Sequence, residues 1–148
     1  MSKAARVTFA TTLHIRDRCL CLHVQRAARK VARQFDEVLR PLGLTNGQFS
    51  LLNALNRAEP ATMGSVATLL AMDRTTLTAA LKPLERRGLI DVTVDEEDRR
   101  SRRLTLTREG QALLAKAVPI WRRTHAEVEL LLGGADPEAL RHSLRALS

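Results

Sequence analysis

Residues 90–106 contain the feature that most restricts how this chain can fold. Ile90, Val92 and Val94 alternate with polar residues, and Leu104 and Leu106 do the same beyond a charged stretch. An alternation with a period of two is typical of a half-buried strand. The stretch between them, DEEDRRSRR, holds four acids and four arginines, and isolated charges are costly to bury. The segment therefore predicts a β-hairpin with a charged tip that projects into solvent.

The residues just before this hairpin predict a helix-turn-helix. A short apolar-patterned segment over 64–70 is followed by the connection Ala71-Met72-Asp73. Asp73 is a good N-cap for a helix over 74–87, and Gly88 is a typical stop. Pro83 lies inside that helix and predicts a local kink. Two short helices joined by about three residues match a helix-turn-helix, and with the hairpin they predict a winged helix.

Longer helical patterns lie on both sides of the winged helix. Apolar residues recur every three or four positions over 13–39, and Thr45 is placed to cap a further helix that ends at Asn56. Residues 61–63 are compatible with a short strand. Thr107 is placed to cap a helix that runs to about residue 132, with a kink expected at Pro119, and Asp136-Pro137-Glu138 opens a last short helix.

These patterns predict one domain over residues 1–148, mainly α with a small β-wing and hence of the α+β class. Residues 44–106 form the winged helix-turn-helix in this interpretation. Residues 7–43 and 107–148 supply the surrounding helical region. A chain of 148 residues is close to the usual size of one domain.

The charge of the chain points to a polyanionic partner. The net charge is +8 and the isoelectric point is about 10.9, values that suit nucleic acid or an anionic surface. Three Phe, one Trp and no Tyr argue against single-stranded nucleic acid, which is bound through aromatic stacking. Duplex DNA needs no such platform, so double-stranded DNA is the expected partner.

The same composition indicates a cytoplasmic protein with no membrane partner. No stretch reaches the roughly 18–20 apolar residues of a membrane span. The N-terminal sequence MSKAARVTFATT has no secretory pattern, and two cysteines do not make a disulfide framework. The four histidines show no paired spacing typical of zinc. We expect no metal and no cofactor, and no nucleophile elbow, phosphate loop or carboxylate pair suggests an enzyme.

The helix over 74–87 has one face suited to a major groove. Its core-facing side carries the leucines at 77, 81 and 84, whereas the opposite side is small, polar and basic. Hydroxyl and basic side chains on such a face can contact base edges and phosphates, and arginine suits the adjacent minor groove. Asp98 is predicted to pair with Arg100 and fix its direction. The predicted DNA-contacting residues are Arg74, Thr75, Thr76, Thr78, Lys82, Arg86, Arg99, Arg100 and Arg102.

Three segments in this order resemble the MarR family of bacterial transcriptional regulators. They are LTNGQFSLLNAL, MGSVATLLAMDRTTLTAALKPLERRGLI and DEEDRRSRRLTLTREG, and the likeness covers roughly residues 15–135. The resemblance implies a homodimer whose terminal helices form the interface. It also implies that each subunit binds half of a near-palindromic operator, with Arg100 in the minor groove and Asp98 holding it.

The terminal segments independently favour a dimer, because they carry more apolar residues than one small domain can cover. Two-fold symmetry also suits repeated half-sites on DNA. The apolar residues are Leu13, Ile15, Leu20, Leu22, Leu130, Leu131, Leu132, Leu140, Leu144 and Leu147.

The resemblance further implies a regulator, and most simply a repressor, that responds to an effector. Many relatives release DNA when a small aromatic or anionic ligand binds between the dimer helices and the winged helix, and others respond to cysteine oxidation. Cys19 is a redox candidate because Arg16 and His23 lie at helical spacing from it, although this chain has none of the tyrosines that the oxidation-sensing branch of the family uses to bond its cysteine. The alternative function is a winged-helix module that binds an acidic protein partner.

Overall fold

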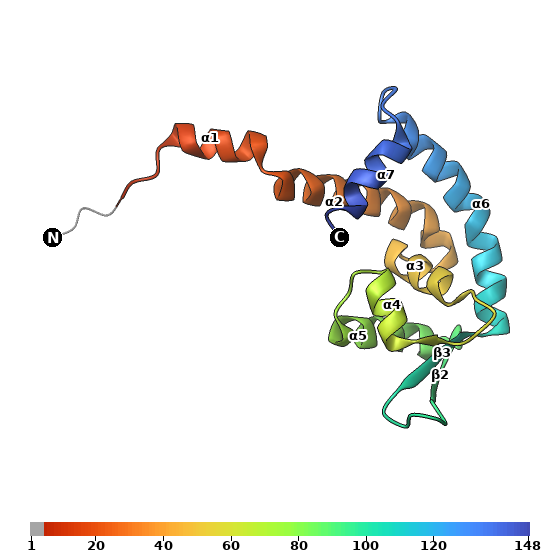
Figure 1. Ribbon diagram of the computed structural model, residues 1–148. Coiled ribbons are helices and arrows are strands. Elements are labelled where there is room, and N and C mark those ends of the chain that lie inside the picture. Colours follow the sequence, from red (N-terminus) through yellow and green to blue (C-terminus); the bar gives the residue numbers. More distant parts are fainter. Residues whose placement is uncertain (1–4) are drawn as a thin grey trace.

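The computed structural model describes residues 5–148, so the first four residues of the N-terminal sequence inspected for a secretory pattern lie outside it. Figure 1 shows two long helices, α2 and α6, above a small lobe that carries the sheet. The elements are α1 (Phe9–Arg18), α2 (Leu20–Leu39), the 3-10 helix η1 (Arg40–Leu42), α3 (Asn46–Leu55), β1 (Ala61–Thr62), α4 (Met63–Leu69), α5 (Arg74–Arg86), β2 (Ile90–Val94), β3 (Arg102–Leu106), α6 (Arg108–Leu130) and α7 (Pro137–Arg145).

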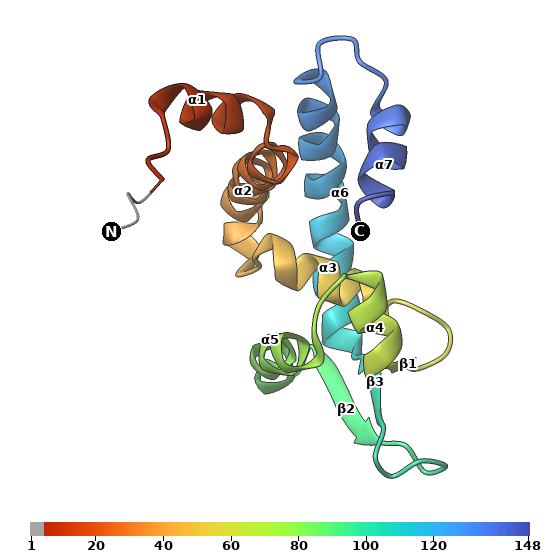
Figure 2. The same ribbon diagram turned by 60° about the vertical axis from the view of Figure 1, so that its left-hand side comes forward.

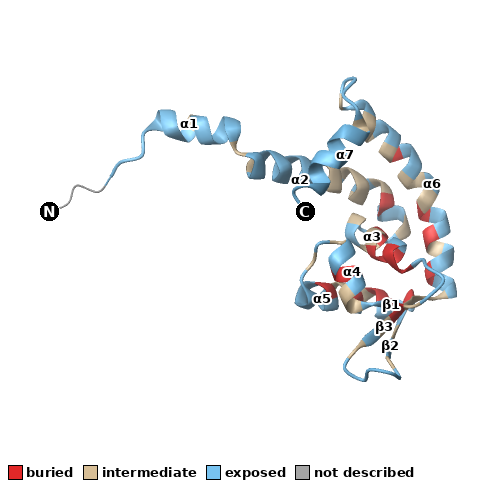
Figure 3. Ribbon diagram, in the orientation of Figure 1, coloured by how far each residue is buried: buried red, intermediate tan, exposed pale blue. Residues whose placement is uncertain are grey.

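The predicted mainly α fold with a small β-wing is confirmed. The strands form an antiparallel sheet in the order β1-β3-β2, so the hairpin gains a third, two-residue strand. Leu104 on the central strand is fully buried and pairs with Ala61 on one side and Val92 on the other. The sheet is thereby tied to the core beneath α3, α4 and α5 (Figure 3).

The core lies in the lobe formed by α3, α4, α5 and the sheet, with contributions from the start of α6. Its fully buried side chains gain the most from removal of apolar area from water, at about 25 cal/mol per Å². The largest of them are Leu39, Leu52, Leu77, Leu84, Ile90, Leu104 and Val66. The core therefore fixes α5 and the sheet against each other, which holds the wing beside the second helix of the helix-turn-helix.

The predicted helix caps are present. Thr45 and Gln48 form a capping box at the start of α3, and the Asp73 carboxylate accepts from the backbone N–H of Thr76. Thr107 accepts from the N–H of Gly110 at 3.0 Å. Such caps satisfy backbone donors that have no partner inside the helix, and they explain why these helices begin where the sequence indicated.

The first helix differs from the sequence expectation of one continuous helix over 13–39. The helix is interrupted at Cys19, whose ψ of 109° is extended, so that α1 and α2 are separate helices. The Cys19 Sγ accepts from the N–H of Leu22 at 3.5 Å, and the His23 Nδ1 lies 2.8 Å from the Cys19 carbonyl oxygen. Cys19 therefore caps α2, a role that apolar periodicity does not encode.

Polar contacts hold the end of α2 against the start of α3, and the loop after α2 against the residue that follows α5. Asp36 accepts from both the backbone N–H and the side-chain amide of Asn46, at 2.7 and 2.8 Å. These bonds, chiefly the backbone one, lower the pKa of Asp36. Arg87, directly after α5, donates to the Gly43 carbonyl at 2.7 Å. The ends of α2, α3 and α5 are thus held together around the η1 turn.

The terminal helices leave much apolar surface exposed (Figure 3). No residue of α1 or α7 is buried. Leu20 at the start of α2 is 69% exposed, Leu130 at the end of α6 is 80% exposed and Leu131 directly after it is 63% exposed, which is unusual for a group of side chains of this size. Within residues 5–148, no helix has the length and apolar character needed to cross a membrane.

Candidate nucleic-acid interface

The outward face of α5 consists of the residues that the sequence singled out. Leu77, Leu81 and Leu84 are buried on the inner side of the helix. The outer side is solvent-exposed over its whole length and combines small, hydroxyl and basic side chains with one acid, Glu85. Its exposed members are Arg74, Thr75, Thr76, Thr78, Ala79, Lys82 and Arg86. The helix is continuous through Pro83, so this face is uninterrupted.

The three threonines of α5 are not equivalent. The Thr76 hydroxyl donates to the Asp73 carboxylate at 2.8 Å, and the Thr78 hydroxyl donates to the Arg74 carbonyl at 2.8 Å. A hydroxyl has one proton to donate, so both donors are engaged within the helix. Among the residues described, the Thr75 hydroxyl forms no hydrogen bond, which leaves it free to donate to a base or a phosphate.

The acids of the wing shape its backbone. Asp98 accepts from the backbone N–H of Arg100 at 3.1 Å, so it holds the turn itself; in the described part of the chain its carboxylate forms no ion pair with the Arg100 guanidinium. Asp95 accepts from the Glu97 N–H at 3.0 Å and pairs with Arg103 at 3.3 Å. These contacts, led by the Glu97 bond, lower the pKa of Asp95. Two of the four acids thus stabilise turns instead of facing a partner.

The arginines of the wing divide into engaged and free side chains. Arg103 pairs with Asp95, and the Arg102 guanidinium folds back onto the carbonyls of Arg99 and Ser101 at 3.2 and 3.3 Å. The guanidinium groups of Arg99 and Arg100 have no hydrogen bond or ion pair within residues 5–148, and both residues are exposed. The free cations of the wing are therefore at its tip.

Two basic residues at the ends of α5 have further neighbours that the sequence did not indicate. The Arg74 guanidinium lies against Gly64 at the start of α4, where an added Cβ would come within 3.3 Å of it. Arg87 bonds to the loop after α2. These contacts join residues that are 10 and 44 positions apart, so no local sequence pattern indicates them.

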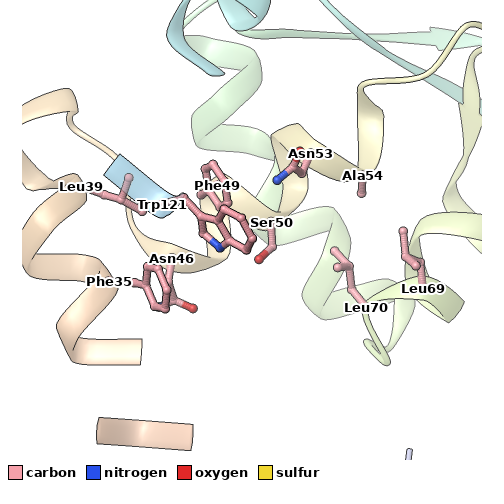
Figure 4. Close-up of a pocket in the computed structure, with 10 residues that line it drawn as sticks. All are labelled: Phe35, Leu39, Asn46, Phe49, Ser50, Asn53, Ala54, Leu69, Leu70 and Trp121. Carbon is pink, nitrogen blue, oxygen red and sulfur yellow. The ribbon is translucent and has the colours of Figure 1, made fainter. Parts of the chain in front are cut away.

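A second feature is a pocket of about 470 Å³ between the long helices and the winged helix (Figure 4). Its wall carries three aromatic side chains, two amides and one hydroxyl. The Trp121 ring stacks on Phe49 at 6.5 Å and on His125 at 4.7 Å between centroids. The lining residues are Phe35, Leu39, Asn46, Phe49, Ser50, Asn53, Ala54, Leu69, Leu70 and Trp121.

The pocket is connected by contacts to the C-terminal helix. His125 lies 3.2 Å from the Glu129 carboxylate, and Arg141 of α7 pairs with the same carboxylate at 2.9 Å and with Glu138 at 2.9 Å. The bonds to these two carboxylates raise the pKa of Arg141. The stack on Trp121 therefore continues into the ion pairs that fasten α7 to α6.

An apolar groove of about 430 Å³ lies between α2, α6 and α7. Val31, Val128, Leu132, Leu140 and Leu144 are among the side chains that line it. Its lining continues into the exposed leucines of the terminal helices. The groove is thus a largely apolar surface that is separate from the basic outer face of α5.

The segment from 42 to 101 matches the model of a protein family described as the MarR family. The chain is similar to the organic hydroperoxide resistance transcriptional regulator of Bacillus subtilis, with 36% identity over 68% of this chain and 69% of that protein. It also resembles the transcriptional regulator MosR of M. tuberculosis in complex with DNA. That structure has a TM-score of 0.77 and 38% identity, covering 87% of this chain and 92% of MosR.

A further solved structure is that of Bordetella bronchiseptica BpsR, whose DNA binding is regulated by 6-hydroxynicotinic acid. Its TM-score is 0.76 and its identity is 25%, over 97% of each chain.

Proposed function

This chain belongs to the MarR family of transcriptional regulators, and we propose that it acts as a homodimeric repressor that binds a near-palindromic operator in duplex DNA. The observation that carries the proposal is the exposed outer face of α5 beside a wing whose two tip arginines are free among the described residues. In this arrangement α5 reads the major groove and the wing enters the adjacent minor groove. The protein acts in the cytoplasm, where such an operator is found.

The division of the chain supports this role. Residues 44–106 provide the DNA-binding part, and residues 7–43 and 107–148 provide the dimerisation part. The exposed leucines of α2, α6 and α7 are covered when a second copy packs against the apolar groove. Two-fold symmetry then presents two α5 helices to two half-sites. The contacts on each half-site come from Arg74, Thr75, Lys82 and Arg86 on α5, and from Arg99 and Arg100 on the wing.

Titrating the protein with a DNA fragment from the region upstream of its own gene tests this proposal. We expect the logarithm of the affinity to fall steeply with the logarithm of salt, by roughly 0.9 per neutralised phosphate. We also expect the fragment to be preferred over random duplex by about a thousandfold or more. The alternative, a winged-helix module for an acidic protein, predicts no preferred fragment. Equal affinity for both duplexes would therefore reject the operator proposal.

The pocket beside Trp121 is the proposed effector site. Three aromatic rings provide stacking surfaces, and amide and hydroxyl groups at Asn46, Ser50 and Asn53 can orient a ligand. Among residues 5–148, no Lys or Arg lines the pocket, so stacking on the aromatic rings and hydrogen bonds to neutral polar groups would hold an aromatic ligand there. Because α2 and α6 meet α3 and α4 here, a ligand would change the angle between the two parts of the chain.

Trp121 is the only tryptophan of the chain and reports on this pocket directly. Adding 6-hydroxynicotinic acid as a probe is expected to change Trp121 fluorescence and to release DNA over the same concentration range. Ser50→Leu, which fills the pocket, should lower the affinity for the probe by about tenfold or more, equivalent to roughly 1.4 kcal/mol. Thr93→Leu, on an exposed strand position, is the control. If both variants bind the probe as the wild type does, the effector does not use this pocket.

Cysteine oxidation is a second candidate signal. Cys19 is half-buried at the junction of α1 and α2, Cys21 is exposed, and both are free thiols. Oxidation of Cys19 would alter the sulfur that caps α2 and would therefore act on the dimerisation part. The organic hydroperoxide resistance regulator to which the chain is similar supports including an oxidant in the DNA titration.

A further inference from the structure

The positive charge of this chain is concentrated outside the winged helix. Residues 1–43 contain nine Lys and Arg against three Asp and Glu, a net charge of +6, whereas residues 44–106 have nine against eight, a net charge of +1. The part of the chain that reads DNA is thus almost neutral overall. The source of most of the +8 net charge is the N-terminal region, and this distribution has no explanation in the operator contacts alone.

Much of this charge lies along one side of α2. With 3.6 residues per turn, four exposed cations at positions i, i+3, i+4 and i+7 occupy about 100° of the helix surface. This side is opposite the apolar side that contains Val24, Val31 and Phe35. We name it the basic ridge, and it consists of Arg26, Arg29, Lys30 and Arg33.

The charges of the basic ridge are not neutralised by neighbouring acids. Within residues 5–148, none of its four cations forms an ion pair, and its one side-chain hydrogen bond runs from Arg29 to Gln25 at 3.2 Å. Like charges three and four positions apart destabilise a helix, and the ridge contains four such pairs. On α7, by contrast, Arg141 and Arg145 both pair with Glu138. On a helix face that contacts only solvent, this repulsion lowers helix stability without any compensating interaction. A bound polyanion would neutralise the charges and remove the repulsion.

We propose that the basic ridge is a second, sequence-independent contact surface for duplex DNA, outside the half-site held by α5 and the wing. The proposal rests on the proposed function, because it takes as partner the polyanion that this protein binds. The ridge is the convex side of a helix, which suits an extended polyanion better than a small ligand. From Arg26 to Arg33 it spans roughly 10 Å, or about three phosphate steps of 3.4 Å. His23, Arg26 and Lys30 border a shallow depression in which a phosphate can sit.

The position of α2 separates this surface from the operator contacts. Helix α2 packs mainly against α6 and α3, and α3 lies between α2 and the helix-turn-helix (Figure 2). The apolar side of α2 contributes Ala27 and Val31 to the groove that a second copy would cover. Lys30 borders this groove, whereas Arg26, Arg29 and Arg33 do not line it, so these three cations of the ridge stay accessible when a second copy covers the groove. Each dimer would then present two such ridges to DNA flanking the operator or to a neighbouring duplex segment.

A charge-matched pair of variants tests the proposal. The ridge variant carries Arg26→Gln, Arg29→Gln and Arg33→Gln, and leaves Lys30, which borders the apolar groove. The control variant carries Lys116→Gln, Arg122→Gln and Arg123→Gln, which removes the same charge from the exposed outer side of α6. Affinity for a random-sequence duplex is measured for both between about 50 and 200 mM salt, with oligomeric state and thermal unfolding as checks on folding.

The ridge variant is expected to lower the salt slope by about 0.9 for each phosphate that it no longer neutralises, up to about 2.7, while the control keeps the wild-type slope. Its thermal stability should not fall, because like-charge repulsion is removed. The proposal would be overturned if the ridge variant kept the wild-type salt slope, or if the control variant lowered the slope equally. Binding of the ridge variant to phosphatidylserine vesicles is measured in parallel. If it lost vesicle binding while its DNA binding stayed intact, the proposal would also be overturned. The wild type's preference for its upstream fragment is read separately, so failure of the ridge and failure of the proposed function are distinguishable.

Discussion

Replacing Gly110 by alanine is expected to destabilise this protein by about 3 kcal/mol or more, the upper end of overpacking effects. Gly110 is buried in the first turn of α6. A Cβ on it would overlap the Leu89 carbonyl oxygen and would lie 2.8 Å from the Leu106 Cδ1. Neither neighbour can yield easily, because Leu89 bonds through that carbonyl to the Thr107 N–H at 3.1 Å. The helix and the wing strands would have to move apart.

Urea unfolding monitored by circular dichroism measures this effect. Gly47→Ala is the matched control, since among the described residues the only atom near its added Cβ is the Thr45 Oγ1 at 3.9 Å. Inside α3, alanine replaces glycine with a gain of up to about 1 kcal/mol. If Gly110→Ala were as stable as Gly47→Ala, the contact between the start of α6 and the hairpin would not be as tight as described.

The winged helix could be predicted from the sequence because its signals are local. Asp73 as a cap, the short connection after residue 70 and the alternation on both sides of the charged loop each fall within a few residues, and the structure confirms them. The outer face of α5 followed from a helical period of 3.6 residues. Its exposure could be derived because Leu77, Leu81 and Leu84 share one side of the helix and must face the core, which leaves the opposite side to solvent.

The roles of individual polar atoms could not be derived in the same way. Whether a threonine hydroxyl is free depends on a competing acceptor, which at Thr76 is the cap and at Thr78 is a carbonyl one turn earlier. In the wing, Asp98 was expected to pair with Arg100, and the group that it contacts is the Arg100 backbone N–H. Short acidic side chains readily bond to backbone groups two residues ahead, and periodicity carries no information about that choice.

The break at Cys19 shows a different limit of the sequence. Apolar residues continue with helical spacing through the junction of α1 and α2, so their pattern favours one helix. The extended backbone at Cys19 and its cap on Leu22 depend on a single residue of low cap preference. The pocket was also beyond reach, because Trp121 meets Phe49 only when α6 folds back over α3.

Arg100→Ala is expected to weaken binding to the upstream DNA fragment by roughly ten- to hundredfold, or about 1–3 kcal/mol. Its guanidinium is exposed at the wing tip, and no contact within residues 5–148 engages it. A cation held this way suits the negative potential of a narrow minor groove. Because Asp98 holds the Arg100 backbone N–H and not the side chain, the turn should survive the substitution with stability and dimerisation unchanged.

Arg102→Ala is the matched control for this experiment, because the Arg102 guanidinium is already bonded to two wing carbonyls. Its removal should reduce affinity less than the removal of Arg100, even though both variants lower the net charge by one. Fluorescence anisotropy at one fixed salt concentration gives the comparison, and size-exclusion chromatography verifies the dimer. Equal reductions in the two variants would mean that the wing contributes only diffuse charge. An unchanged affinity for Arg100→Ala would remove the wing tip from DNA recognition and leave α5 to bind alone.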